Sequence, residues 1–160
     1  MLEVEIAKVD VSAKKTYRMT DHVAKERPLH IFLDKTHYVT IFCSPNNLKE
    51  LAVGHLLSEG IIKSIEEIEK TDFKEDGICH VKLNPNVNIE NRLKLSERFS
   101  RIILSACGGP YLPQPSKRLP KVGSRLTVKA EVIEDCVSRL NFIAETFRKT
   151  GGVHIAAIYD

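Results

Sequence analysis

The chain has 160 residues, 42% of them hydrophobic, and its 24 basic and 21 acidic side chains give a formal net charge of +3 at pH 7. The hydrophobic share excludes a wholly disordered chain, and the length suits one domain or two small ones. So slight a positive charge gives no reason to expect a nucleic-acid partner.

The hydropathy of the chain gives no reason to expect a membrane either. No apolar run approaches the ~20 residues of a membrane-spanning helix, and residues 1–8 lack the basic and apolar regions of a secretory signal. The cysteines form no Cys-x-x-Cys pair, which argues against a zinc ribbon or a redox dithiol and for reduced thiols. We therefore expect a cytoplasmic protein without a bound metal.

Strand-like runs dominate the N-terminal part of the sequence. Apolar and charged residues alternate over 2–9, which is the period of a half-buried strand. A polar connection is expected at about 14–27. The β-rich runs 29–33 and 38–42, with a turn at 34–37 between them, then predict a hairpin.

A helix is predicted after this hairpin. Asn47 and Glu50 have capping-box spacing, in which each side chain bonds a free backbone amide at the helix start. Gly60 is well placed to end the helix in a left-handed conformation. The helical spacing of apolar positions predicts a buried face made of Leu48, Leu51, Ala52, His55 and Leu56.

The middle of the chain alternates between regular elements and loops. Ser64 and Glu67 repeat the capping spacing and predict a short second helix, and the run 78–83 predicts a strand. The polar stretch 84–100 is interpreted as a connection and contains the best candidate for a domain boundary. The run 101–106 predicts a buried strand, and a loop rich in glycine and proline follows it.

The C-terminal part is predicted to be a helix and a strand. Apolar residues recur at helical spacing over 133–147, and Gly151 and Gly152 close that stripe. The run 153–159 predicts a last strand that is apolar on both faces, which belongs inside a covered sheet. We therefore expect the sequence to stop within a domain. Uncovered apolar surface would then favour a homo-oligomer or aggregation.

Cys107 is the strongest candidate for a chemically reactive residue. It follows a predicted strand and precedes Gly108 and Gly109, so its thiol can be exposed at a sheet edge. Converging backbone amides in a glycine turn, together with Lys117 and Arg118 in the next loop, would favour the thiolate. A thiolate is the nucleophile for sulfur or acyl transfer. The alternative is an ordinary buried thiol at the end of a strand.

His154 is a second candidate, because it follows Gly-Gly at the start of a predicted strand. It could act as a general base or a ligand near Cys107, or be a hydrogen-bonded histidine on a half-buried strand. Glu59 is interpreted as a charge at a helix end. We expect core positions for Cys43, Cys79, Cys136 and His55, and a solvated helix face for Glu66, Glu67 and Glu69.

Six separated segments, in the right order, resemble one protein family, the FdhD family of formate dehydrogenase accessory sulfurtransferases. The segments 26–29, 43–45, 50–54 and 57–62 resemble the N-terminal half of that family. Ser105-Ala-Cys-Gly108 resembles its Ser-Cys-Gly loop, and Thr150-Gly-Gly-Val-His-Ile-Ala156 resembles its Thr-Gly-Gly-x-His-x-Ala strand.

The resemblance implies a sulfur carrier. Such proteins accept sulfane sulfur from a cysteine desulfurase as a cysteine persulfide. They pass it to the molybdenum of the bis(molybdopterin guanine dinucleotide) cofactor of formate dehydrogenase, and Cys107 matches the persulfide-bearing cysteine. This guanine-nucleotide-containing cofactor would be a transient ligand, not a tightly bound one, and its expected contacts are Gly108, Gly151, Gly152 and His154.

The implied fold class is α+β / α/β. A small N-terminal α+β portion is expected at 1–97, and the start of a cytidine-deaminase-like α/β portion, apparently truncated, at 98–160. Gly109-Pro110 replaces the end of the family's Cys-x-x-Cys, and the family's later acidic-Val-Gly-Arg-His-Asn segment is absent from the sequence. These departures favour an alternative function as a non-catalytic binding module. A zinc deaminase would need close cysteine spacing, which is also absent.

Overall fold

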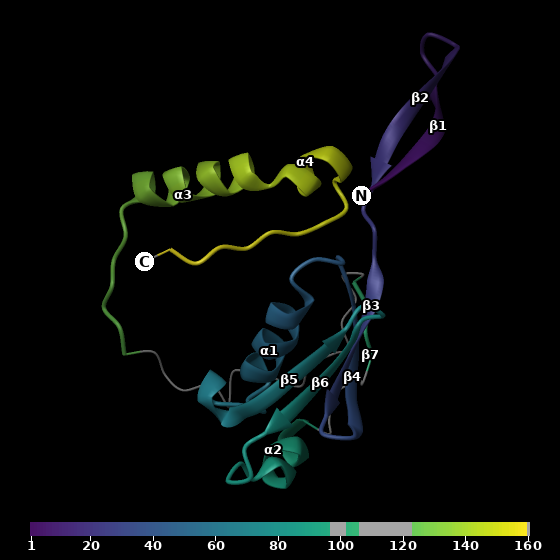
Figure 1. Cartoon of the computed structure of the whole chain (residues 1–160). Helices are drawn as coiled ribbons and strands as arrows, with labels where there is room; N and C mark the ends of the chain where they lie inside the picture. Colours follow the sequence, from purple (N-terminus) through teal and green to yellow (C-terminus); the bar gives the residue numbers. More distant parts are fainter. Residues whose placement is uncertain (97–101, 106–122, 160) are drawn as a thin grey trace. The chain divides into compact units, whose positions relative to one another are not determined.

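The computed structural model describes residues 1–96, 102–105 and 123–159 (Figure 1). Contacts divide the chain into two compact units. One unit covers 26–117, and the other combines 1–25 with 118–160. The boundary expected between residues 97 and 98 lies outside the described residues, so it stays a prediction.

The 26–117 unit is built on a five-stranded mixed sheet with the order β5-β6-β3-β4-β7 (Figure 1). β3 and β4 form the predicted hairpin, and β6 coincides with the strand predicted at 78–83. β5 joins β6 antiparallel, whereas β6 and β7 run parallel to β3 and β4. The bounds are β3 Arg27–Leu33, β4 Thr36–Cys43, β5 Ile68–Lys74, β6 Ile78–Leu83 and β7 Ile102–Ile103.

One face of this sheet packs against helix α1 (Leu48–Ser58) and forms the core. Successive side chains of a strand point to opposite faces, so β3 buries Leu29, Ile31 and Leu33 on the helix side. Each fully buried leucine or isoleucine contributes about 1.5–3 kcal/mol. The core cluster comprises Leu29, Ile31, Leu33, Val39, Ile41, Leu48, Ala52, Leu56, Ile61, Ile62, Cys79, Val81 and Leu83.

The sequence predicted the C-terminal end of α1 correctly but not its N-terminal cap. Gly60 adopts φ 70° just after the helix, as predicted, and its amide donates to the Leu57 carbonyl at 3.1 Å. The predicted capping box is wrong, because Asn47 is left-handed at φ 52° and its side chain makes no capping bond. A capping side chain needs the extended backbone of an ordinary N-cap residue.

Two shorter helices connect the strands of this unit. A single 3-10 turn, η1 (Ile65–Glu67), lies where the short second helix was predicted, although Ser64 makes no side-chain capping bond. Helix α2 (Ile89–Ser96) occupies much of the predicted connection at 84–100. β7 confirms a strand after it, but the expected burial is wrong, since Ile102 is 54% and Leu104 61% exposed. Among the described strands, β7 is the last of the sheet and pairs with β4.

The other unit contains an antiparallel hairpin, β1 (Leu2–Asp10) and β2 (Lys15–Val23). β1 was predicted, but the polar connection expected at about 14–27 is wrong, since β2 pairs with β1 from Val23 back to Lys15. The charged residues Lys15, Arg18 and Asp21 interrupt the apolar alternation of Tyr17, Met19 and Val23.

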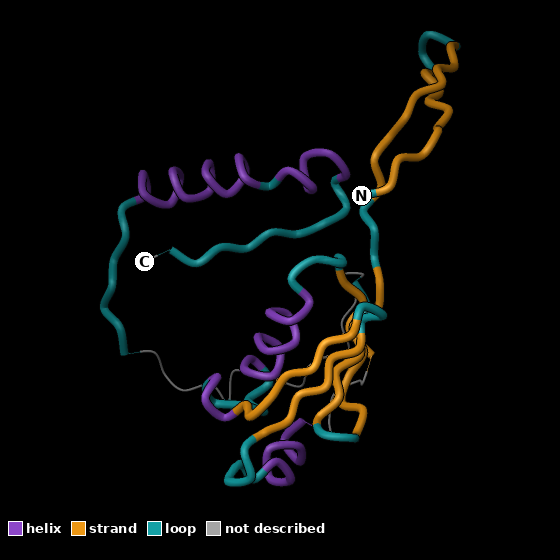
Figure 2. The backbone as a smooth tube through the Cα atoms, viewed as in Figure 1, coloured by secondary structure: helices purple, strands orange, loops and turns teal. Residues whose placement is uncertain are grey.

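Helices α3 (Ala130–Ile143) and α4 (Glu145–Thr150) belong to this second unit. The continuous stripe expected over 133–147 is interrupted at Ala144, whose ψ of 52° is not helical and which is 3% exposed. The predicted strand at 153–159 is not formed, and Figure 2 shows this stretch as loop. A strand needs a neighbour for its backbone groups, and the described part of the chain pairs none with it.

The structure is therefore a mixed α+β protein, as the sequence predicted at the level of fold class. None of the described helices is both long and apolar enough to span a membrane.

Candidate functional site

The loop that resembles the family's active-site loop begins at the edge of the five-stranded sheet. β7 is parallel to β4, with Thr40 opposite Ile102 and Ile41 opposite Ile103. Parallel strands end at the same edge of a sheet, so Cys43 at the end of β4 and Ser105 just after β7 lie at that edge. Cys107 and Gly108 lie outside the described residues, and their roles stay predictions.

Cys43 is half-buried at this sheet edge, and its thiol is poorly suited to carry a negative charge. Burial raises the pKa of the Cys43 thiol, the Glu26 carboxylate raises it further, and Arg27 opposes both. The Sγ atom lies 3.8 Å from the Arg27 carbonyl oxygen. Cys43 is therefore protonated at neutral pH, which makes it a weak nucleophile.

The other two described cysteines are Cys79 and Cys136. Cys79 is fully buried on β6, as expected for a core residue, and burial raises the pKa of its thiol. Cys136 lies on α3 and is only partly buried, so the expected core position is wrong. The reason is that none of the residues of α3 is fully buried.

The Thr-Gly-Gly-x-His motif forms the end of α4. Gly151 adopts φ 62°, and its amide donates to the Phe147 carbonyl at 2.7 Å, which closes the helix. The Gly152 amide donates to the Thr150 hydroxyl at 3.2 Å. A Cβ at Gly152 would lie 3.2 Å from the Ala24 Cβ, so the turn packs closely against the residue after β2. His154 follows on the extended stretch with an exposed side chain.

His55, near the end of α1, has an imidazole whose pKa is set mainly by burial. It lies on α1 with its ring centroid 6.1 Å from that of Tyr38. Burial lowers the pKa of the His55 imidazole, and Glu59 opposes that shift. The ring is therefore neutral at pH 7. It is half-buried, so the core position expected for His55 is not fully reached.

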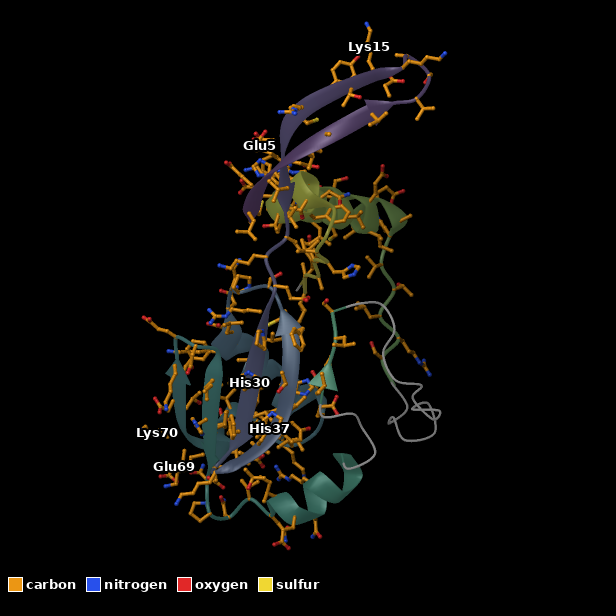
Figure 3. All side chains as sticks on the ribbon, turned by 90° about the vertical axis from the view of Figure 1, so that its right-hand side faces the viewer. Glu5, Lys15, His30, His37, Glu69 and Lys70 are labelled. Carbon is orange, nitrogen blue, oxygen red and sulfur yellow. The ribbon has the colours of Figure 1, made fainter. Side chains whose placement is uncertain are left out.

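A cluster of aromatic and imidazole rings on the other face of the sheet was missed by the sequence analysis. The Thr40 hydroxyl oxygen lies 2.9 Å from His30 Nδ1 and 2.9 Å from His37 Nε2 (Figure 3). Phe32 stacks on His80 at 4.8 Å and meets His37 edge-on at 5.2 Å. The signal was available, since period-two alternation places His30 and Phe32 opposite the core-facing residues of β3.

His30, His37 and Thr40 form what we call the histidine–threonine cluster. Its hydrogen bonds restrict which ring nitrogen of each histidine carries a proton. One hydroxyl has a single hydrogen to donate, so it can serve only one of the two imidazole nitrogens as donor. The other imidazole must donate its own N–H to the Thr40 oxygen. The shared hydroxyl thus couples the tautomers of His30 and His37.

The glutamates expected on one solvated helix face have separate structural roles. Glu67 pairs with Arg92 of α2, with Oε1 2.9 Å from Nη2 and Oε2 2.5 Å from Nη1. The Arg92 side chain lowers the pKa of Glu67 to about 2. Glu69 lies on β5 and pairs with Lys82 of β6. The expectation is wrong for both residues because this stretch is a helical turn followed by a strand.

Within the described ranges, no three histidine, cysteine, aspartate or glutamate side chains are grouped so that they could hold a metal ion. Two of the places that resemble the family are described: Ser105 at the sheet edge of the 26–117 unit, and the glycine turn at Gly151 in the other unit.

The model of the FdhD/NarQ family matches residues 24–160. The sulfur carrier protein FdhD of Staphylococcus aureus strain MRSA252 is 31% identical over 150 residues, and that of strain Newman is 33% identical. Each match covers 91% of this chain and 55% of the relative. A putative formate dehydrogenase accessory protein from Desulfotalea psychrophila, of known crystal structure, is 26% identical with a TM-score of 0.48, over 51% of this chain and 35% of that one.

The chain belongs to the FdhD/NarQ family, because the family model covers most of its length. It spans about half the length of the curated relatives that it matches.

Proposed function

We propose that this chain carries sulfur for the maturation of formate dehydrogenase, with Cys107 as the residue that holds the sulfur. The observation that supports this most is family membership over 24–160, a range that includes Ser105-Ala-Cys-Gly108. The matched relatives are named sulfur carrier proteins. The raised thiol pKa values of Cys43 and Cys79 also make these two cysteines poor competitors for the role.

The first chemical step is a thiolate attack on a persulfide. The Cys107 thiolate attacks the outer sulfur of a persulfide on a cysteine desulfurase, a new S–S bond forms at Cys107, and the S–S bond of the donor breaks. The donor leaves as a thiolate, so no net oxidation or reduction occurs. Cys107 then carries the sulfane sulfur as its own persulfide.

The second step delivers this sulfur to the substrate, the molybdenum of the bis(molybdopterin guanine dinucleotide) cofactor. Delivery as sulfide consumes two electrons, which a thiol reductant would supply, and returns Cys107 to the thiolate. The Gly108 backbone would approach the reacting sulfur, and Gly151, Gly152 and His154 would contact the cofactor. We place these residues in a cytidine-deaminase-like arrangement by resemblance to the family.

Intact mass spectrometry tests the carrier residue. Incubation with a cysteine desulfurase and cysteine should add about 32 Da, one sulfur atom, to the parent chain and to Cys43→Ala, but not to Cys107→Ala. Both variants remove one thiol, so Cys43→Ala is the matched control. An adduct that persists in Cys107→Ala would show that another cysteine carries the sulfur.

Gly109-Pro110, which replaces the end of the family's Cys-x-x-Cys, favours a second candidate, a binding module that keeps partner contacts without transferring sulfur. Its signature would be a stable complex with the desulfurase and no mass adduct on any variant.

A further inference from the structure

His37 lies on the same face of the sheet as His30 because β4 contains a bulge. Val39 is buried in the core, so period-two alternation alone would point His37 towards the core as well. The register of β3 and β4 shifts once, and Tyr38 is the extra residue, which packs against the core cluster. The shift returns His37 to the face of His30. Bulges re-aim side chains in this way and are over-represented next to active sites.

The bulge directs two imidazole nitrogens at one atom. His30 Nδ1 and His37 Nε2 each lie 2.9 Å from the Thr40 hydroxyl oxygen, and the two ring centroids are 6.3 Å apart (Figure 3). Both rings are half-buried, so each is partly exposed to solvent. Two nitrogen donors and one oxygen donor from adjacent strands are therefore gathered on one face of the sheet.

Hydrogen bonding does not use both nitrogens in the same way. The hydroxyl has one hydrogen, so one imidazole accepts it and the other must turn its own N–H towards the oxygen. A neutral imidazole can carry its hydrogen on either ring nitrogen without a change in net charge. In the tautomers with the hydrogen on the outer nitrogens, His30 and His37 present two lone pairs at the same place, which is what a metal cation requires.

We propose that His30 and His37 bind one divalent transition-metal ion, with the Thr40 hydroxyl as a third and weaker donor. Imidazole suits Zn²⁺, Cu²⁺ and Ni²⁺, whereas Mg²⁺ and Ca²⁺ take oxygen ligands. A zinc ion would lie between the two nitrogens, about 2.0–2.1 Å from each, and water would complete its coordination. Phe32, edge-on to His37 at 5.2 Å, would form an apolar wall beside the ion.

The proposed site is smaller than a full set of ligands. Among the described residues no three histidine, cysteine, aspartate or glutamate side chains are grouped for a metal, and the lack of a close cysteine pair argued against one. Two imidazoles and an alcohol leave positions open for water, so the ion would be held less tightly than in a closed site. The proposal does not depend on the sulfur-carrier function, because none of the three residues has a part in sulfur transfer.

A zinc titration of the full chain, followed by the ¹⁵N chemical shifts of the imidazole rings, tests the site. The sequence has six histidines, and the ring nitrogens show which of them bind. The Nδ1 resonance of His30 and the Nε2 resonance of His37 should move together along one saturation curve, while those of the other four histidines stay in place. This readout is specific to imidazole, so zinc taken up by thiols does not obscure it.

Substitutions separate the site from the surrounding sheet face. His30→Gln and His37→Gln should each weaken zinc binding at the remaining imidazole at least about tenfold, because one of two nitrogen donors is lost. His80→Gln is the matched control and should bind as the parent chain, since His80 is a half-buried imidazole on the same face whose Nδ1 lies near the Asp34 carbonyl. Unmoved His30 and His37 resonances would overturn the proposal. Equal shifts of all six histidines, which mean adventitious zinc, or equal weakening by His80→Gln would overturn it as well.

Discussion

At the residue scale, the histidine–threonine cluster shows how one hydroxyl organises one face of the sheet. Thr40 is 8% exposed, and its oxygen is the common partner of His30 and His37, which come from different strands. A buried polar group that loses its partner costs free energy, so the cluster depends on this single side chain.

Thr40→Val should lower the free energy of unfolding by about 1–2 kcal/mol. Valine keeps the branched shape of threonine and removes the hydroxyl, so both imidazoles lose a hydrogen bond. Urea denaturation measures the change. Thr36→Val, at the exposed start of the same strand, is the control and should be nearly neutral. Equal effects of the two substitutions would mean that the shared hydroxyl contributes nothing to stability.

At the element scale, two connections fix how strands and helices meet. Gly77, in the turn between β5 and β6, adopts φ 88°, and a Cβ there would lie 2.6 Å from the Pro28 carbonyl oxygen. The Glu67–Arg92 pair joins the 3-10 turn to α2, and Arg92 also donates to the Ile61 carbonyl at 2.9 Å. The first connection depends on backbone conformation and the second on charge.

Gly77→Ala should destabilise the protein by about 2–4 kcal/mol, because it combines a left-handed backbone with a backbone clash. Gly54→Ala is the matched control. Gly54 lies inside α1 with open space around it, so alanine there should stabilise by about 0.5–1 kcal/mol through helix propensity. Thermal melts of both variants compare them. A neutral Gly77→Ala would contradict the close approach of β3 to this turn.

The Glu67–Arg92 pair should make stability depend on pH in acid. The pKa of Glu67 falls from 4.5 to about 2 in the folded protein, so the folded state binds fewer protons than the unfolded state between these values. Its stabilisation is therefore complete above about pH 5 and is lost as the pH falls towards 2.

Urea titrations from pH 5 to pH 2 should show a shallower pH dependence for Glu67→Gln than for the parent chain. Glu69→Gln, which removes the exposed partner of Lys82, serves as the control. If the stability of Glu67→Gln depended on pH as steeply as that of the parent chain, Glu67 would not be the source of the acid dependence.

The elements that the sequence predicted well are those with local signals. Alternation and a turn were sufficient for β3 and β4, and Gly60 marked the end of α1. β2 was missed because its apolar alternation is mixed with charges, and the Asn47 cap failed because spacing does not report a left-handed φ. The histidine–threonine cluster joins residues of two strands, so it depends on the register of β4 on β3, which alternation within either strand does not give. At the candidate site, Cys107 is a prediction from the sequence pattern and lies outside the described residues, whereas the register of β7 on β4 places Ser105 at the sheet edge.

At the scale of the whole molecule, the two units differ in how they are stabilised. The 26–117 unit has a continuous core between its sheet and α1. In the other unit, Ala144 is the one buried residue among those described. Most of the exposed large hydrophobic side chains of the described residues also belong to this unit. The first unit contains Ser105 just after β7, and the second contains the glycine turn at Gly151.

The most direct test of the sulfur-carrier function is onward transfer of labelled sulfur. The chain is loaded with ³⁵S from labelled cysteine by a cysteine desulfurase, separated from the donor, and mixed with formate dehydrogenase whose molybdenum cofactor lacks its sulfur, in the presence of a thiol reductant. The account predicts that the label leaves the chain, appears with the cofactor of the dehydrogenase, and never loads onto Cys107→Ala. Label that stays on the chain, or that reaches the cofactor equally well through Cys107→Ala, would contradict it.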